Sequence, residues 1–279
     1  MAKVLFAIIF LSLAALAVFY LYIIPKPSSV PGFPENPIVI TRQAFISESG
    51  YYILSGDISC ANLSTEEACI SFGGKIDNFL LDCRGHSITG KVIMRDNRSR
   101  ALLANGIEIH LDAHGTLKNC VVQGFGISGI LLHHSSGNTI TNNTLLDNQI
   151  GIYNDGSPNN SITNNIAINN TYGIYVFLEE SSNVLVANNT ANDNAEGIYF
   201  FDSPLNGIIT GNTANNNRNY GIWLNLAYNI TVAGNRLCGN PKGSMLCENS
   251  TVIDNGGNIC EEGTISCGGM GIRCADGCR

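Results

Sequence analysis

The chain has 279 residues, a formal net charge of −7 and only 13% charged residues. This length allows one elongated domain with a tail. The charge balance excludes nucleic acid as the partner, because a phosphate backbone calls for a basic face that this sequence lacks.

Residues 1–24 form the first predicted element. Lys3 is followed by an apolar run from Val4 to Ile24, with only Ser12 as a polar break. A run this long can span the hydrocarbon layer of about 30 Å as a helix, whereas a secretory signal has a shorter apolar core and a small-residue cleavage site. We therefore predict a transmembrane anchor in a single-pass cell-membrane protein, with the rest of the chain extracytoplasmic. The alternative, a cleaved signal peptide, also places the remaining chain outside the cytoplasm.

Residues 25–37 and 38–57 lead from this anchor into the rest of the chain. The first segment holds five prolines, which predicts a semi-extended linker. The second alternates apolar and polar residues around a Ser-Gly turn, which predicts two short strands that cap the first coil of a repeat.

Five copies of one pattern follow between residues 129 and 240. A Gly-Ile pair recurs every 22 to 24 residues, at Gly129, Gly151, Gly173, Gly197 and Gly221. Two columns of Asn keep step, namely Asn143, Asn165, Asn189, Asn212 and Asn235, and Asn138, Asn160, Asn183, Asn206 and Asn229. This period is typical of a solenoid, and the short Ile, Thr and Tyr segments favour a parallel β-helix over a leucine-rich horseshoe. We interpret the Asn columns as structural, because Asn tolerates the left-handed backbone of a corner and its amide can bond to the next coil.

Two further coils precede these copies, over residues 69–90 and 105–126, with an insertion over residues 91–104 between them. With the insertion set aside, Cys83 and Cys120 face each other on adjacent coils about 4.8 Å apart, within disulfide reach. The sequence therefore predicts a parallel β-helix of about seven coils that occupies residues 38–240 together with its N-terminal cap.

Ten cysteines gather at the two ends of the repeats, the last six in a predicted Cys-rich cap over residues 241–279. They are Cys60, Cys69, Cys83, Cys120, Cys238, Cys247, Cys260, Cys267, Cys274 and Cys278. We predict disulfides in preference to zinc, since no His is interleaved and the chain is placed outside the cytosol. Eight N-x-S/T sequons also suit an external glycoprotein, at Asn62, Asn97, Asn142, Asn159, Asn169, Asn188, Asn229 and Asn249.

The segments LLDCRGHSITG (80–90) and LKNCVVQGFGISGILL (117–132), followed by repeated NTITNNT and GIY, resemble a known family. It comprises the right-handed parallel β-helix repeat proteins of prokaryotic, often archaeal, cell surfaces. Residues 38–240 are similar in particular to the group named for the periplasmic copper-binding protein NosD. The resemblance implies an all-β, right-handed solenoid, and a relation to carbohydrate-binding and sugar-hydrolase modules.

An outward column of aromatic residues is the first candidate site. Alternation places the Ile after each repeat Gly inside and the next residue outside. The outward residues are Tyr153, Tyr175, Tyr199 and Trp223, with Phe177 and Phe201 two places further on. Aromatic faces at the coil spacing can hold sugar rings, so we predict a carbohydrate-binding platform. Alternatively, aromatics on neighbouring strands only stabilise the sheet, by about 0.2 to 1 kcal/mol per pair.

A group of His and Asp residues is the second candidate. His110, His133 and Asp155 share one outward column and are candidates for acid–base catalysis, while His110, His133 and His134 could hold copper or zinc. The motifs of polygalacturonase-like, pectate-lyase-like and alginate-epimerase β-helices are missing, and no cofactor is predicted. We predict a surface binding or structural module that recognises carbohydrate. A polysaccharide-active enzyme (lyase, epimerase or hydrolase) and a NosD-like copper-handling protein are the alternatives.

Overall fold

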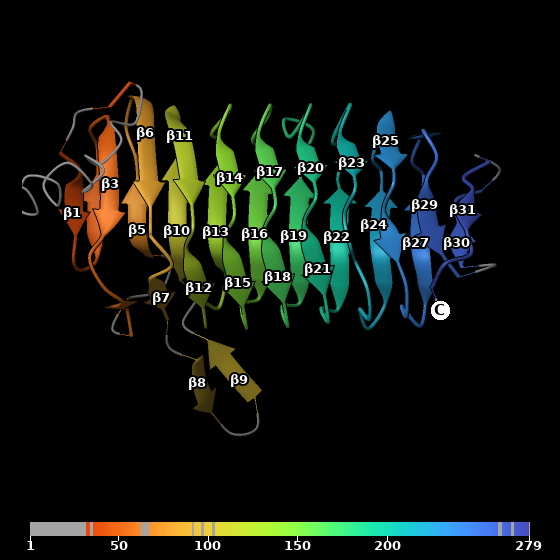
Figure 1. Ribbon diagram of the computed structural model, residues 1–279, viewed down its shortest axis with the longest axis horizontal. Coiled ribbons are helices and arrows are strands. Elements are labelled where there is room, and N and C mark those ends of the chain that lie inside the picture. Colours follow the sequence, from red (N-terminus) through yellow and green to blue (C-terminus); the bar gives the residue numbers. More distant parts are fainter. Residues whose placement is uncertain are drawn as a thin grey trace, which may run out of the picture. The chain divides into compact units, whose positions relative to one another are not determined.

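A computed structural model describes residues 32–33, 36–61, 63, 67–90, 92–95, 98–101, 104–261, 264–268 and 271–278. The chain divides into two units, residues 1–37 and 38–279, and the strands of the described residues belong to the second. That unit is a β-solenoid of about nine turns, whose strands form three parallel sides that run along its axis (Figure 1).

Sheets A and B form two sides of the solenoid, and their strands follow one another along its axis. Sheet A contains β1 (Ile38–Ile40), β3 (Gly50–Leu54), β6 (Ile76–Asp82), β11 (Ala113–Lys118), β14 (Thr139–Thr141), β17 (Ser161–Thr163), β20 (Leu185–Ala187), β23 (Ile208–Thr210), β25 (Ile230–Ala233) and β28 (Val252–Asp254). Sheet B contains β2 (Ala44–Ile46), β5 (Ala68–Phe72), β10 (Asn105–His110), β13 (Ser128–His133), β16 (Ile150–Asp155), β19 (Tyr172–Phe177), β22 (Glu196–Phe201), β24 (Tyr220–Asn225), β27 (Gly243–Glu248) and β30 (Ile265–Ser266).

Sheet C forms the third side of the solenoid. It contains β4 (Ile58–Ser59), β7 (Ser87–Thr89), β12 (Val121–Gln123), β15 (Thr144–Leu146), β18 (Ile166–Ile168) and β21 (Thr190–Asn192). Single bridges through Thr213 continue it to β26 (Arg236–Leu237), β29 (Asn258–Cys260) and β31 (Cys274–Ala275). An antiparallel hairpin, β8 (Val92–Arg95) and β9 (Arg98–Ala101), occupies the predicted insertion between β7 and β10 (Figure 1).

The core runs along the inside of the solenoid and is built from columns of like residues. The Ile that follows each repeat Gly pairs with its counterpart on the next coil, as Ile152 does with Ile174 and Ile174 with Ile198. All three side chains are fully buried. The predicted inward direction of this column is therefore confirmed, and each buried Ile contributes about 1.5 to 3 kcal/mol of hydrophobic stabilisation.

Two buried Asn ladders tie the coils together. The predicted column from Asn143 to Asn235 extends to Asn258, and each side-chain Oδ1 accepts the backbone N–H of the Asn one coil before, at 2.9–3.0 Å. A second ladder, which the sequence pattern did not reveal, runs from Asn148 to Asn240 with bonds of 2.8–2.9 Å. Neither ladder uses left-handed backbone. The positive φ lies one residue earlier, for example 56° at Asn142, and the buried Asn that follows directs its amide inward to bond.

The column predicted from Asn138 to Asn229 is in fact two columns. Asn138 and Asn160 are buried and bonded to each other, whereas Asn183, Asn206 and Asn229 are exposed corner residues. The strand register explains the difference, since Ser161 pairs with Leu185 and so aligns Asn160 with Val184. The corner after β19 is longer than the corner after β16, which shifts the Asn by one position.

Two predictions about the fold class need correction. The solenoid has about nine turns and not seven, because β1 to β4 and β27 to β31 continue the three sheets where only end caps were expected. Within the described part of the chain there is no helix, and therefore none long and apolar enough to cross a membrane. Residues 1–24, on which the predicted anchor rested, lie outside the described residues. The transmembrane helix and the single-pass membrane location are therefore withdrawn.

All ten cysteines form disulfides, which close the two ends of the solenoid. The pairs are Cys60–Cys69, Cys83–Cys120, Cys238–Cys278, Cys247–Cys267 and Cys260–Cys274. The predicted approach of Cys83 and Cys120 is confirmed, with their Cα atoms 4.8 Å apart on adjacent coils.

Candidate functional site

The outer surface of sheet B carries a continuous group of aromatic side chains, which we name the aromatic face. Its members are Tyr153, Tyr172, Tyr175, Phe177, Tyr199, Phe201, Tyr220 and Trp223. The strand register brings them together, since Tyr153 pairs with Tyr175, Tyr175 with Tyr199, and Tyr199 with Trp223. The predicted outward direction of the column from Tyr153 to Trp223 is therefore confirmed.

The rings of the aromatic face are stacked with a lateral offset. Tyr175 lies between Tyr153 and Tyr199, with ring centroids 5.1 and 5.0 Å apart and interplanar angles of 6° and 10°. Parallel rings in van der Waals contact are about 3.5 to 4 Å apart, so the remaining separation is an offset of about 3 to 3.6 Å. Each ring therefore leaves part of its face uncovered by its neighbour.

Two members of the aromatic face were not predicted. Tyr172 stacks on Tyr175 and Tyr199, and Tyr220 lies against Trp223. Each of these two residues precedes a repeat Gly, and strict alternation from the core Ile would turn it inward. The Gly between them interrupts the alternation, which a Gly inside a strand commonly does. The repeat Gly was therefore the one feature of the sequence that could have predicted the outward direction of Tyr172 and Tyr220.

Exposure separates the members of the aromatic face into two kinds. Tyr199 is only 6% exposed, because Tyr172, Tyr175, Phe201 and Trp223 surround it. The other members are partly exposed and can touch a ligand. Burial raises the pKa of Tyr153, Tyr175 and Tyr199, so their hydroxyl groups stay protonated at physiological pH and can donate hydrogen bonds.

Carboxylates border the aromatic face on two sides. Glu248 accepts a hydrogen bond from the indole Nε1 of Trp223 at 2.9 Å and another from Asn225 at 3.2 Å. Glu196 is buried and accepts from the side chain of Asn219 at 2.5 Å and from the backbone N–H of Tyr220 at 3.1 Å. Burial raises the pKa of Glu196, and these two hydrogen bonds offset part of that rise. Neither carboxylate was predicted from the sequence.

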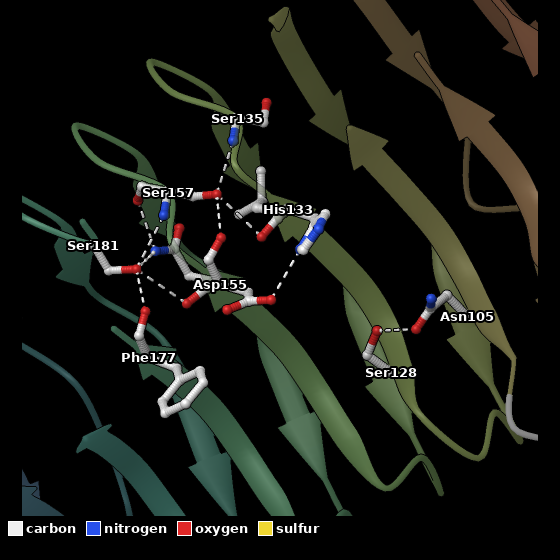
Figure 2. A network of polar contacts seen from close by, with 10 residues as sticks. Asn105, Ser128, His133, Ser135, Asp155, Ser157, Phe177 and Ser181 are labelled. Carbon is white, nitrogen blue, oxygen red and sulfur yellow. Dashed lines mark hydrogen bonds and ion pairs between the residues drawn. The ribbon is translucent and has the colours of Figure 1, made fainter. Parts of the chain in front are cut away.

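The predicted His and Asp group lies at the N-terminal end of the aromatic face. Nδ1 of His133 contacts Oδ2 of Asp155 at 2.9 Å (Figure 2). The ring of His133 lies edge-on to the rings of His110 and His134, with centroids 5.0 and 4.4 Å apart. Nδ1 of His110 and Oδ1 of Asp155 are buried and have no hydrogen-bond partner among the described residues. The structure therefore brings His110, His133 and Asp155 side by side, as the sequence suggested.

A buried serine ladder holds the strand ends that carry these groups. Ser157 Oγ accepts the backbone N–H of Ser135 at 2.9 Å, and Ser181 Oγ accepts that of Ser157 at 3.1 Å (Figure 2). Ser157 Oγ also donates to the backbone carbonyl of Asp155 at 2.7 Å. The ends of β13, β16 and β19 are thereby fixed, and with them the positions of His133, Asp155 and Phe177.

Neither the grouping of possible metal ligands nor the β8–β9 hairpin supports a metal or catalytic site at the His and Asp group. The described residues contain no group of three or more His, Cys, Asp or Glu side chains that could hold a metal ion. The β8–β9 hairpin joins β10 at the Asn105 end, whereas His110 lies at the opposite end of the same strand. By its place in the chain, the hairpin does not enter the solenoid beside the His column.

Six of the eight predicted sequons lie within the described residues. Their Asn side chains are all exposed, at Asn142, Asn159, Asn169, Asn188, Asn229 and Asn249. The other two, Asn62 and Asn97, lie outside the described residues. Glycosylation of these positions stays a prediction.

The three-sheet solenoid with its aligned columns defines the class of protein. Residues 80–237 match the family described as right handed beta helix region, and the chain belongs to that family. No curated protein matches the chain in sequence. The narrower grouping with NosD-like proteins and the archaeal origin stay predictions.

Solved structures with the same fold include tailspike proteins and alginate epimerases. The Dettilon tailspike protein is 18% identical, with 84% of this chain and 59% of that chain covered and a TM-score of 0.52. The enzymatically active domain of bacteriophage CBA120 tailspike protein 2 is 13% identical, with 77% of this chain and 38% of that chain covered and a TM-score of 0.57. The periplasmic alginate epimerase AlgG is 15% identical, with 78% of this chain and 64% of that chain covered and a TM-score of 0.54. This chain spans less than two thirds of each of these proteins. At these identities the likeness shows the fold alone.

Proposed function

We propose that this protein is a carbohydrate-binding β-helix, and that its aromatic face holds a polysaccharide. The observation that carries the proposal is the unbroken stack from Tyr153 to Trp223 on the outside of sheet B, across four coils. Partly exposed apolar rings grouped on one surface are typical of a binding site. The similar structures include an alginate epimerase, so the fold is known to serve carbohydrate chemistry elsewhere.

The shape of the aromatic face suits a linear polymer. The partly exposed rings of Tyr153, Tyr175 and Trp223 follow one another along the solenoid axis, and the C–H groups of a sugar ring can pack on exposed aromatic surface. The column from Asp155 through Phe177 and Phe201 to Glu248 spans four coil steps, or about 19 Å. This length accommodates several sugar units.

Sheet stabilisation is the competing explanation of the stack. Each aromatic pair on neighbouring strands contributes about 0.2 to 1 kcal/mol without any ligand. Under sheet stabilisation, loss of the exposed rings lowers stability and leaves polysaccharide retention unaffected. A binding role requires the loss of polysaccharide retention in a protein that is still folded.

The test is a triple variant, Tyr153→Ala, Tyr175→Ala and Trp223→Ala, which leaves the buried Tyr199 in place. Its matched control is Ile166→Ala with Ile208→Ala, which removes apolar side chains that are 41% and 43% exposed on sheets C and A. Electrophoresis through gels that contain polysaccharide measures retention, and urea unfolding measures stability. We expect retention to fall at least about tenfold in the triple variant and to stay unchanged in the control. Equal retention in a folded triple variant would contradict the proposal.

An enzyme acting on polysaccharide is the second candidate, and the His133–Asp155 contact of 2.9 Å favours it. A carboxylate that orients a His is a common arrangement for a general base, and this pair adjoins the Tyr153 end of the aromatic face. Release of new reducing ends or unsaturated sugars from a retained polysaccharide would support it, provided that His133→Ala abolishes the release. Copper handling is not proposed, since no described group fits a metal site.

A further inference from the structure

The outer surface of sheet B combines aromatic rings with charge of one sign. From β10 to β27, the strands of this sheet contain four carboxylate side chains and no Lys or Arg. The four are Glu108, Asp155, Glu196 and Glu248. The aromatic face lies among these carboxylates.

The strand register gives the positions of three of these carboxylates relative to the rings. In one column Asp155 and Glu248 lie at the two ends of a row that contains Phe177, Phe201 and Asn225. Glu196 lies in the strand beside Tyr172, whose ring stacks on Tyr199. A polymer lying along the stack would therefore have a carboxylate near each end of the row, partly exposed at Asp155 and exposed at Glu248, while Glu196 lies buried beside the rings.

No Lys or Arg within the described residues forms an ion pair with these carboxylates. Within the described residues, the ion pair of Asp155 is with His133, and Glu248 is held by the uncharged donors of Trp223 and Asn225. Lys242 and Arg218 act on Glu196, but they precede β27 and β24, at the corners that lead into the sheet. The field of Asp155 and Glu248 reaches the rings, since their carboxylates add to the rise in the pKa of Tyr153 and Tyr199.

From this arrangement we infer that the aromatic face selects an uncharged polysaccharide and rejects a polyuronate. The inference rests on the proposed function and narrows its ligand class. Hydroxyl groups of a neutral sugar can donate to the exposed carboxylate of Glu248 and can lie near Asp155 without charge repulsion, whereas the carboxylate of a uronate carries the same charge and no proton to donate at neutral pH. Like charges brought together at an interface oppose binding and exclude wrong partners.

The test compares polymers that differ only in the C6 group. Mannan is paired with polymannuronate, glucan with polyglucuronate and galactan with polygalacturonate, and the affinity of the full chain is measured for each at low ionic strength. We expect at least one neutral polymer to bind, at least about tenfold more tightly than its uronate. Added salt should narrow the difference, because it screens repulsion between exposed charges.

A pair of variants separates the local effect from net charge. Asp155→Asn with Glu248→Gln removes two carboxylates at the aromatic face and keeps the shape of the side chains. Asp147→Asn with Asp193→Asn removes the same charge from exposed corners that follow sheet C, at positions whose φ of 55° and 58° Asn tolerates. We expect the ratio of uronate to neutral affinity to rise at least about threefold in the first variant only.

The outcomes distinguish the two proposals. A uronate that binds as tightly as its neutral partner, or an equal change in both variants, overturns the selectivity and leaves carbohydrate binding intact. Failure of all six polymers to bind the folded protein overturns carbohydrate binding itself.

Discussion

The indole Nε1 of Trp223 donates a hydrogen bond to the carboxylate of Glu248, 2.9 Å away on the next coil. This contact fixes the last ring of the aromatic stack, whose centroid lies 4.4 Å from that of Tyr199. An exposed carboxylate of the following strand therefore sets the orientation of a candidate ligand contact.

Trp223 is the single Trp of the chain, so its fluorescence reports this contact directly. We expect Glu248→Ala to shift the emission to longer wavelength, because the indole loses its acceptor and meets more water. The free energy of unfolding should change by less than about 0.5 kcal/mol, as is usual for an exposed position. Glu180→Ala, at an exposed corner, is the control. An unchanged emission spectrum in Glu248→Ala would show that the hydrogen bond does not orient the ring.

The buried Asn ladder should matter far more for stability than the exposed Asn residues. Asn165 accepts from the backbone N–H of Asn143 at 2.9 Å and donates to the carbonyl of Ile140 at 2.8 Å. Asn165→Ala leaves both buried groups without a partner, so we expect a loss of at least about 2 kcal/mol in urea unfolding. The exposed Asn183→Ala should cost less than about 0.5 kcal/mol. Equal losses would mean that the ladder contributes no more than a surface residue.

The repeat Gly residues allow the coils to approach closely. A Cβ on Gly197 would lie 2.4 Å from the carbonyl oxygen of Gly221, which is backbone and cannot move aside freely. We expect Gly197→Ala to lower the free energy of unfolding by about 1 to 3 kcal/mol. Gly56 has no atom within 4 Å of the same position, so Gly56→Ala should leave stability unchanged or raise it by up to about 1 kcal/mol. Thermal unfolding of both variants checks the contrast.

Glu196 should couple stability to pH. Burial raises the pKa of its carboxyl group above the ordinary value of 4.5, so the folded state binds the proton more tightly than the unfolded state does. The stability that comes from this protonated group is fully present below pH 4.5 and is lost as pH rises through the higher, folded pKa.

Glu196→Gln removes this titration and serves as the reference. We expect the free energy of unfolding of the natural chain, relative to that of Glu196→Gln, to increase as pH falls from 7 toward 4.5. Urea unfolding of both proteins across this range measures the difference. A difference that shrinks with falling pH would show that the anion is the form that stabilises the fold.

Features that depend on one strand and its period could be predicted from the sequence. The inward Ile column and the outward column from Tyr153 to Trp223 follow from the alternation of side chains, which is a local property of an extended chain. The proximity of Cys83 and Cys120 followed from the same period once the insertion was set aside. The sequence by itself therefore determined the coil, its core and the outward direction of the column from Tyr153 to Trp223.

Features that depend on register between coils were decided only by the tertiary structure. The longer corner after β19 turned one predicted Asn column into two, and the Gly before each core Ile brought Tyr172 and Tyr220 onto the aromatic face. Which carboxylate meets which ring depends on the offset between strands more than 20 residues apart, as for Glu248 and Trp223. Corner length and backbone bulges set that offset, and neither is encoded in the repeat period.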